Sequence, residues 1–128
     1  MQNIILVAIG GMLGCVTRYG VLSAFSENIR TKLPEYINYV LVVNVIGSFL
    51  IGLIFAGYER GFFNSNTFNI VKPLLAIGFL GGLTTFSSFT LDFLQFIQKG
   101  QVINGLIYVV LSVFLGIVAV YAGYLIAK

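Results

Sequence analysis

The residues best suited to chemistry lie in one run, positions 78–89, which combines glycines, hydroxyl side chains and two phenylalanines. The adjacent Gly81 and Gly82 each cost a helix roughly 1 kcal/mol relative to alanine, and the β-branched Thr84 and Thr85 stiffen the chain after them. We therefore expect a helix to break here. Backbone freed from helical bonding inside a bilayer is tolerated only where protein buries it or where it lines a polar cavity, so a break would mark an ion or substrate site. The alternative is that the glycines only allow close helix packing.

The polar groups near this run indicate which ion it would suit. Hydroxyls and amides donate hydrogen bonds, and the edges of phenylalanine rings carry the positive part of the ring quadrupole. The candidate donors are Asn44, Phe86, Ser87, Ser88, Phe89, Thr90, Tyr108 and Ser112. Because carboxylates are nearly absent from the apolar stretches, these donors favour a path for a small anion. Carbonyl oxygens released at positions 81–84 would instead suit a hard cation that is held and not conducted.

Several of these residues also have a purely structural interpretation. Asn44 must be bonded, because a free amide in hydrocarbon costs several kcal/mol, but a contact between two helices would satisfy it as well as a ligand would. Ser48 lies one turn after Asn44 on the same face. Tyr108, Ser112 and Gly116 follow one another at i, i+4 spacing and form either a polar stripe or a packing groove with a hydroxyl bonded to its own backbone.

Two charged residues and one cysteine stand within or near apolar stretches. Arg18 either anchors its helix by extending to the interface or lends positive potential to the mouth of an anion path. Asp92 lies towards the far end of its stretch, and we expect it at the interface, apart from the path. Cys15 is interpreted as a small packing residue, and a single cysteine excludes a disulfide within the chain.

Composition predicts the elements that position these residues. The 128 residues are 59% hydrophobic and only 9% charged, with a mean hydropathy of +1.02, a balance that excludes a soluble globular domain. About 20 apolar residues cross a hydrocarbon core of roughly 30 Å. The expected fold is therefore a single all-α integral membrane domain with four transmembrane helices, the third of them broken. Their approximate ranges are 4–25, 36–58, 73–97 and 102–127.

Little of the chain is left outside these four helices, so we do not expect an enzyme. Neither ATP nor nucleic acid is an expected partner, since no phosphate-binding Gly-x-x-x-x-Gly-Lys motif is present. Four short helices enclose little volume by themselves. A transport path would more readily form between subunits, which predicts a homo-oligomer embedded in membrane lipid.

The positive charges do not favour either orientation in the membrane. With four helices, one side would hold Arg60, Lys72 and Lys128, and the other would hold Arg30, Lys32 and Lys99, three against three. The excess of lysine and arginine that fixes the orientation of membrane proteins is therefore missing. Such a chain should insert both ways, and it could then form an antiparallel dimer whose twofold axis lies in the membrane plane.

Several of these stretches resemble the Fluc (CrcB) family of fluoride channels. The resemblance rests on the run 78–89, on Val-Asn-Val-Ile-Gly at 43–47, on Gly-Gly-Met-Leu-Gly at 10–14 ahead of Arg18, and on positions 108–112. It covers nearly the whole chain. By this resemblance the protein would be a dual-topology antiparallel homodimer in a bacterial inner membrane, with two fluoride pores and one structural Na⁺ at the dimer centre.

The resemblance also implies roles for individual residues. The backbone carbonyls of Gly81 and Thr84 would hold the Na⁺, and Arg18 would lie near the vestibule. The side chains along the fluoride pore would be Asn44, Phe86, Phe89, Tyr108 and Ser112, with Ser87, Ser88 and Thr90 adding hydroxyls.

Three positions depart from the family pattern. Val40 and Gly116 stand where some members have hydroxyls, and Asp92 stands where relatives often have glutamate. The length of the polar track is therefore open.

Two other functions are compatible with a small membrane protein of balanced charge. A dual-topology multidrug or cation antiporter would need a carboxylate in its first helix to exchange protons, and positions 4–25 contain none. A membrane assembly subunit without transport activity would explain the glycines, but not the clustered threonine, serine and phenylalanine. A passive fluoride channel, driven by the electrochemical gradient of the anion, is the favoured prediction.

Overall fold

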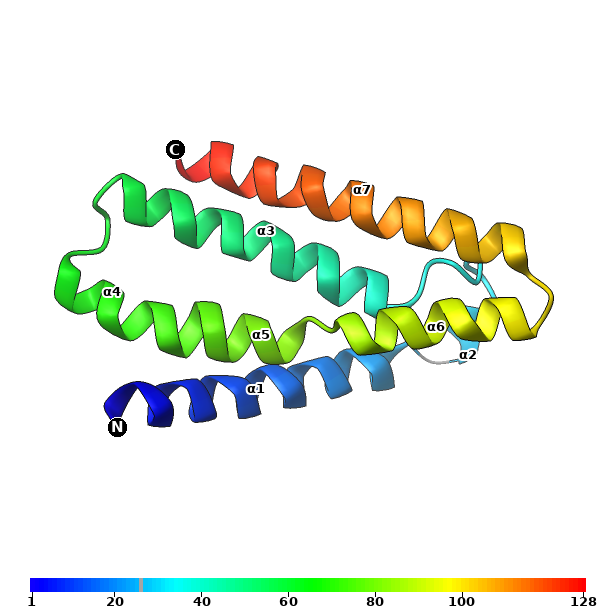
Figure 1. Ribbon diagram of the computed structural model, residues 1–128, viewed down its shortest axis with the longest axis horizontal. Helices are drawn as coiled ribbons and strands as arrows, with labels where there is room; N and C mark the ends of the chain where they lie inside the picture. The colour runs from blue at the N-terminus through cyan, green and yellow to red at the C-terminus, as the bar shows by residue number, and fades with distance from the viewer. Residues whose placement is uncertain (26) are drawn as a thin grey trace.

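The computed structural model describes residues 1–25 and 27–128, so that Ser26, the first residue of the predicted loop at 26–35, lies outside the described residues. Within the described ranges the secondary structure is helical, without strands, and four helices are long and apolar enough to cross a membrane. The predicted all-α membrane fold with four spanning helices is confirmed. The chain runs back and forth, and both termini lie at the same end of the molecule as the connection between α3 and α4 (Figure 1).

The first, second and fourth spanning helices are continuous. They are α1 (Gln2–Ala24), α3 (Tyr39–Glu59) and α7 (Val102–Ala127), and a short helix α2 (Glu27–Arg30) lies in the first connection. The third spans Ser65–Gln98 in segments. These segments are α4 (Ser65–Val71), the π-helical η1 (Lys72–Phe79), α5 (Leu80–Leu83) and α6 (Phe86–Gln98).

The third spanning helix begins earlier than its sequence suggests. It starts at Ser65, where the Asn64 side chain accepts a hydrogen bond from the Thr67 amide at 2.8 Å, and not at position 73. Pro73 lies inside the helix because the wide π turns of η1 replace the regular α-helical bonding that proline, which has no N–H, would interrupt. At the end of η1 the Leu80 amide donates to the Leu75 carbonyl, five residues back.

The expected break in this helix is present. α5 ends at Leu83, Thr84 and Thr85 are extended with ψ of 156° and 122°, and α6 begins at Phe86. The break lies well inside the spanning segment, so the backbone groups of these two threonines must find partners other than the next helical turn.

Helix packing places the break at the centre of the molecule. α3 packs along α7, α1 packs against η1 and α5, and α6 continues along α7 (Figure 1). Two small clusters of buried residues flank the break, one built from Leu41, Phe96 and Tyr108 and the other from Val43, Leu80 and Leu83. Most other large apolar side chains are exposed, as expected where lipid surrounds the helices.

The contact between α1 and the third helix depends on small residues. A Cβ atom added at Gly10 would collide with the backbone carbonyl of Leu74, and one added at Gly14 would collide with that of Phe79. The two helices therefore approach backbone to backbone, as the i, i+4 spacing of these glycines predicts. Gly20, farther along α1, faces open space.

We predict that Gly14→Ala destabilises the protein by about 1–3 kcal/mol, the usual range for overpacking, because α1 must move away from Phe79. Thermal unfolding of the detergent-solubilised protein measures the effect. Gly20→Ala on the same helix is the matched control and should cause no loss. Equal destabilisation by both variants would contradict the backbone contact as its cause.

Candidate functional site

The break between α5 and α6 is held by its own threonines. Thr85 is the N-cap of α6, and its hydroxyl oxygen accepts a hydrogen bond from the Ser88 amide at 3.2 Å. The same hydroxyl lies 3.3 Å from the Ser87 hydroxyl and donates to the Ser88 hydroxyl at 3.2 Å. The Thr84 hydroxyl donates back to the Leu80 carbonyl at 2.8 Å. Threonine thus supplies both the extended backbone and the polar group that starts the next helix.

Asn44, on α3, closes the break from the opposite side. Its Oδ1 accepts a hydrogen bond from the Thr85 amide at 2.8 Å, and its Nδ2 donates to the Thr85 carbonyl at 3.1 Å. The Asn44 side chain thereby supplies the hydrogen-bond donor and acceptor that an unbroken helix would have given to the backbone of Thr85. A primary amide carries two N–H groups, and one of them suffices for the Thr85 carbonyl. The second remains available to a ligand.

The break also changes the surroundings of two carbonyl oxygens. In an uninterrupted helix the Thr85 amide would donate to the Gly81 carbonyl, four residues back, and here it donates to Asn44. The Thr84 carbonyl accepts from the guanidinium of Arg18 at 3.3 Å, while its usual helical donor, the Ser88 amide, is bonded to Thr85. Arg18 therefore lies against the break, and its acceptor is a backbone carbonyl.

A cleft of about 430 Å³ opens beside the break, between α3, the segmented helix and α7. It gathers six of the residues singled out from the sequence, namely Asn44, Gly81, Thr84, Phe86, Phe89 and Ser112. The Phe86 ring is 76% exposed and lies 5.7 Å from the Phe89 ring, centroid to centroid. The Ser112 hydroxyl is buried and has no hydrogen-bond partner within the described part of the chain. The cleft is thus lined by aromatic rings and polar residues, and the hydroxyl of one of these residues is buried and unbonded within the described part of the chain.

Four of the other predicted site residues lie outside the lining of this cleft. Ser87 and Ser88 bond to the Thr85 hydroxyl, and the exposed Thr90 hydroxyl donates to the Ser87 carbonyl at 3.0 Å. Tyr108 is fully buried, although its ring lies 5.3 Å from that of Phe89, which lines the cleft. Of these four, Ser87 and Thr90 are exposed, and Tyr108 packs behind the cleft through its contact with Phe89.

Asp92 does not stand apart from the polar groups, as the sequence suggested. Its Oδ2 accepts a hydrogen bond from the Tyr108 hydroxyl at 2.9 Å and a second from Nδ2 of Asn38 at 2.9 Å. Asp92 lies outside the lining of the cleft, as expected, but the packing of α6 along α7 brings it against Tyr108, one of the predicted path residues. Tyr108 therefore directs its hydroxyl hydrogen to a carboxylate.

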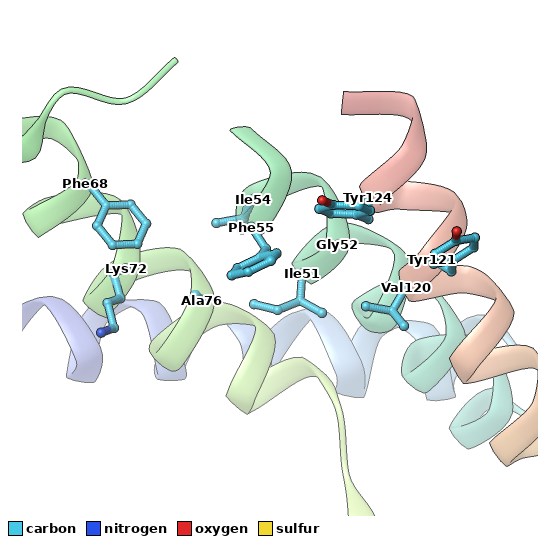
Figure 2. A pocket seen from close by; sticks show the side chains of 10 residues that line it. All are labelled: Ile51, Gly52, Ile54, Phe55, Phe68, Lys72, Ala76, Val120, Tyr121 and Tyr124. Atoms are coloured by element: carbon cyan, nitrogen blue, oxygen red, sulfur yellow. The ribbon is translucent and has the colours of Figure 1, made fainter. Parts of the chain in front are cut away.

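A second cavity, of about 520 Å³, continues from the cleft along the same face. Ile51 and Ala76 line both cavities. Figure 2 shows it between α3, the α4–η1 segment and α7, with the rings of Phe55 and Tyr124 on one wall. The lining is apolar apart from the ends of a few side chains. Two adjoining cavities thus hollow one side of the molecule.

Sequence reasoning missed two residues that shape this site. Thr85 was recognised only as part of the break, although a threonine immediately ahead of an apolar run is a helix-start signal. Asn38 was not singled out, although an asparagine ahead of the apolar run of α3 is a strong N-cap. Neither signal predicts which residue of another helix becomes the hydrogen-bond partner.

Comparison with known proteins identifies the family. The model of the family described as CrcB-like protein, Camphor Resistance (CrcB), matches residues 5–124. A relative from Francisella philomiragia, named fluoride-specific ion channel FluC, is 38% identical, covering 94% of this chain and 91% of the relative. Proteins of the same name from Flavobacterium psychrophilum and Rhizobium etli are 37% and 41% identical, covering 100% and 96% of this chain and 98% and 94% of their own lengths. The chain belongs to the CrcB family.

Proposed function

We propose that this integral membrane protein is a fluoride-specific ion channel that lets the anion leave the cytoplasm passively, down its electrochemical gradient. The observation that carries the proposal is the similarity, over nearly the whole chain, to relatives named as fluoride channels. Their name describes a channel and not an enzyme. The relatives are bacterial, which supports the inner membrane of a bacterium as the proposed location.

The cleft offers what a small anion needs on its way through a membrane. Fluoride must exchange part of its water shell for protein groups that hold it weakly enough to let it leave. Asn44 and Ser112 line the cleft, and the second N–H of Asn44 is a hydrogen-bond donor. The Ser112 hydroxyl, which is buried and unbonded within the described part of the chain, would have to turn towards the cleft to donate. The rings of Phe86 and Phe89 add weakly positive edges. No acidic residue lines the cleft within the described part of the chain, so a passing anion meets little repulsion.

The finer architecture in this proposal is an antiparallel homodimer with two pores. Three lysines or arginines on each side of the membrane leave both orientations equally favourable. A twofold axis in the membrane plane, passing near the break, would set the cleft of one subunit against the apolar cavity of the other. The exposed ring of Phe86 would then have an apolar cavity to enter, and each pore would be completed by both chains.

The proposal also includes a structural Na⁺ at the centre of the dimer, held by the carbonyls of Gly81 and Thr84. These residues fit a hard cation: the break withdraws the usual helical donor from the Gly81 carbonyl, and the Gly81 Cα faces open space. One chain offers only this pair, so a second copy would have to supply the remaining oxygen ligands. The Arg18 contact leaves the Thr84 carbonyl one lone pair for the ion. Such an ion would attract the carbonyl oxygens of both copies and so hold their two helix breaks together.

The channel function predicts rapid efflux of fluoride, and negligible efflux of chloride, from liposomes that contain the purified protein. Phe86→Ile should lower the fluoride rate about fivefold, because the loss of about 1 kcal/mol of ring-edge interaction corresponds to that factor. Asn44→Asp should lower it further by placing a negative charge on the path. Phe62→Ile, which changes a similarly exposed ring in the connection after α3, is the matched control and should leave the rate unchanged.

Equal rates for the two anions, or no fluoride efflux from the parent protein, would refute the channel proposal. If Phe86→Ile and Asn44→Asp fold normally and conduct like the parent, the channel survives but the assignment of its path does not.

The antiparallel arrangement predicts which introduced cysteines can be cross-linked between subunits. In a Cys15→Ala background, Gly81→Cys lies near the proposed axis and should form a dimer with a short bifunctional thiol reagent. Tyr121→Cys, on the same face of the molecule but near one end of α7, should not, because its copies would lie on opposite sides of the membrane. Efficient cross-linking at Tyr121→Cys, measured by gel electrophoresis, would instead indicate a parallel dimer.

The Na⁺ proposal predicts that sodium stabilises the folded protein. An ion that binds only the folded state adds about 2.7 kcal/mol at one hundred times its dissociation constant. The thermal unfolding midpoint in detergent should therefore rise with Na⁺ concentration, and it should not rise with choline at the same ionic strength. An identical response to both cations would rule out a specific sodium site.

A further inference from the structure

The side chain of Asn38 forms hydrogen bonds with two different helices. Its Oδ1 accepts from the Leu41 amide at 3.0 Å and so caps the start of α3. Its Nδ2 donates to Oδ2 of Asp92, on α6, at 2.9 Å. Turning the amide by half a rotation would place a donor against the Leu41 amide and an acceptor against the carboxylate, so the cap fixes the direction of the donor. Asn38 therefore offers Asp92 a rigidly held N–H.

Asp92, held by Asn38, in turn forms a hydrogen bond with a residue of α7. Its Oδ2 also accepts from the Tyr108 hydroxyl at 2.9 Å, and the Tyr108 side chain is fully buried. The carboxylate thus lies between two neutral donors from different helices. Although it is half-buried between helices, Asp92 does not line the cleft. Its negative charge is held behind the path, and not in it.

Tyr108 in turn contacts the cleft through an aromatic neighbour. Its ring lies 5.3 Å from that of Phe89, tilted by 39°, and it lies 5.6 Å from the buried Phe96 on the other side. Phe89 lines the cleft, and its ring edge is one of the proposed anion contacts. A shift of Tyr108 would therefore move or release the Phe89 ring. A continuous chain of contacts runs from Asn38 through Asp92 and Tyr108 to Phe89.

We propose that Asn38 is a positioning residue of the fluoride path. It anchors the Asp92 carboxylate outside the cleft, and through the Asp92–Tyr108 bond it fixes the ring of Phe89 that the anion passes. The inference rests on the proposed channel function. The inference also gives Asp92 a role. Because the aspartate side chain is short, we infer that Asp92 needs the hydrogen bond from Asn38 to stay within reach of the Tyr108 hydroxyl.

The first test separates the donor of Asn38 from its helix cap. Asn38→Asp keeps an equally good N-cap acceptor for Leu41 but turns a second carboxylate oxygen towards Asp92. Fluoride efflux from liposomes should fall by about tenfold, as expected when repulsion frees a carboxylate to approach the anion path. Asn64→Asp is the matched control, because Asn64 caps α4 in the same way, at 2.8 Å from the Thr67 amide, and its described hydrogen bonds include no carboxylate. That variant should conduct like the parent.

The second test is rescue by exchange. The double variant Asn38→Asp with Asp92→Asn restores one amide and one carboxylate across the same pair. The introduced amide nitrogen takes the place of Oδ2 of Asp92, and its two N–H groups can donate to the introduced carboxylate and to the Tyr108 hydroxyl oxygen. Efflux should return to within about threefold of the parent, a coupling that double-mutant cycles detect between residues in contact. A purely structural role of Asn38 at the helix start predicts no such rescue.

The outcomes distinguish this inference from the channel proposal. If the parent protein carries no fluoride, the proposed function itself fails. If the parent conducts and folded Asn38→Asp conducts equally well, or if the exchanged pair remains as slow as Asn38→Asp, the positioning role is overturned. Should Asn38→Asp not elute as a single folded species, Asn38→Ser takes its place, because serine keeps the cap but cannot reach Asp92. Parent-like efflux from Asn38→Ser would equally overturn the proposal.

Discussion

The pair of hydrogen bonds between Asn44 and Thr85 is the interaction on which the rest of this structure depends. A helix broken inside a membrane exposes amides and carbonyls that no water can satisfy, and each would cost several kcal/mol if left unbonded. Asn44 removes this cost for one residue at the break with an amide and a carbonyl of its own, at 3.1 and 2.8 Å. The break can therefore persist without a ligand, and the neighbouring groups remain free for function.

The position of this pair determines what the cleft contains. Because the Thr85 amide is bonded to α3, the helix cannot resume before Phe86, and Thr85 becomes the cap of a new helix whose first residue projects its ring outward. The same rearrangement leaves carbonyls on the α5 side of the break and donors on the α6 side. A single interruption thus separates the acceptor groups suited to a cation from the donors and ring edges suited to an anion. Arg18 meets the acceptor side, where its guanidinium donates to the Thr84 carbonyl.

Much of this arrangement could be predicted from the sequence, because it follows from local preference and hydropathy. Four apolar stretches gave the spanning helices, and two glycines followed by two threonines located the break. The start of the third helix could not be found in this way, since Pro73 is a normal first-turn residue and only the π-helical bonding of η1 lets it lie inside. The link between Asn38 and Asp92 was equally hidden, because the two residues are 54 positions apart and depend on how three helices pack. Local sequence patterns predicted which polar groups matter, but their hydrogen-bond partners depend on how the helices pack.

The hollow face of the molecule is consistent with the proposed dimer. The Ser112 hydroxyl is buried yet unbonded within the part of the chain that the structure describes, and Phe86 extends from a face with two joined cavities of about 430 and 520 Å³. Lipid tails could fill the apolar cavity, but they cannot satisfy carbonyls released at a helix break. A second copy in the opposite orientation would bring both an aromatic ring for the cavity and a further set of carbonyls. In the proposed dimer the same association that completes packing would also complete the path, so assembly and ion selectivity would depend on one interface.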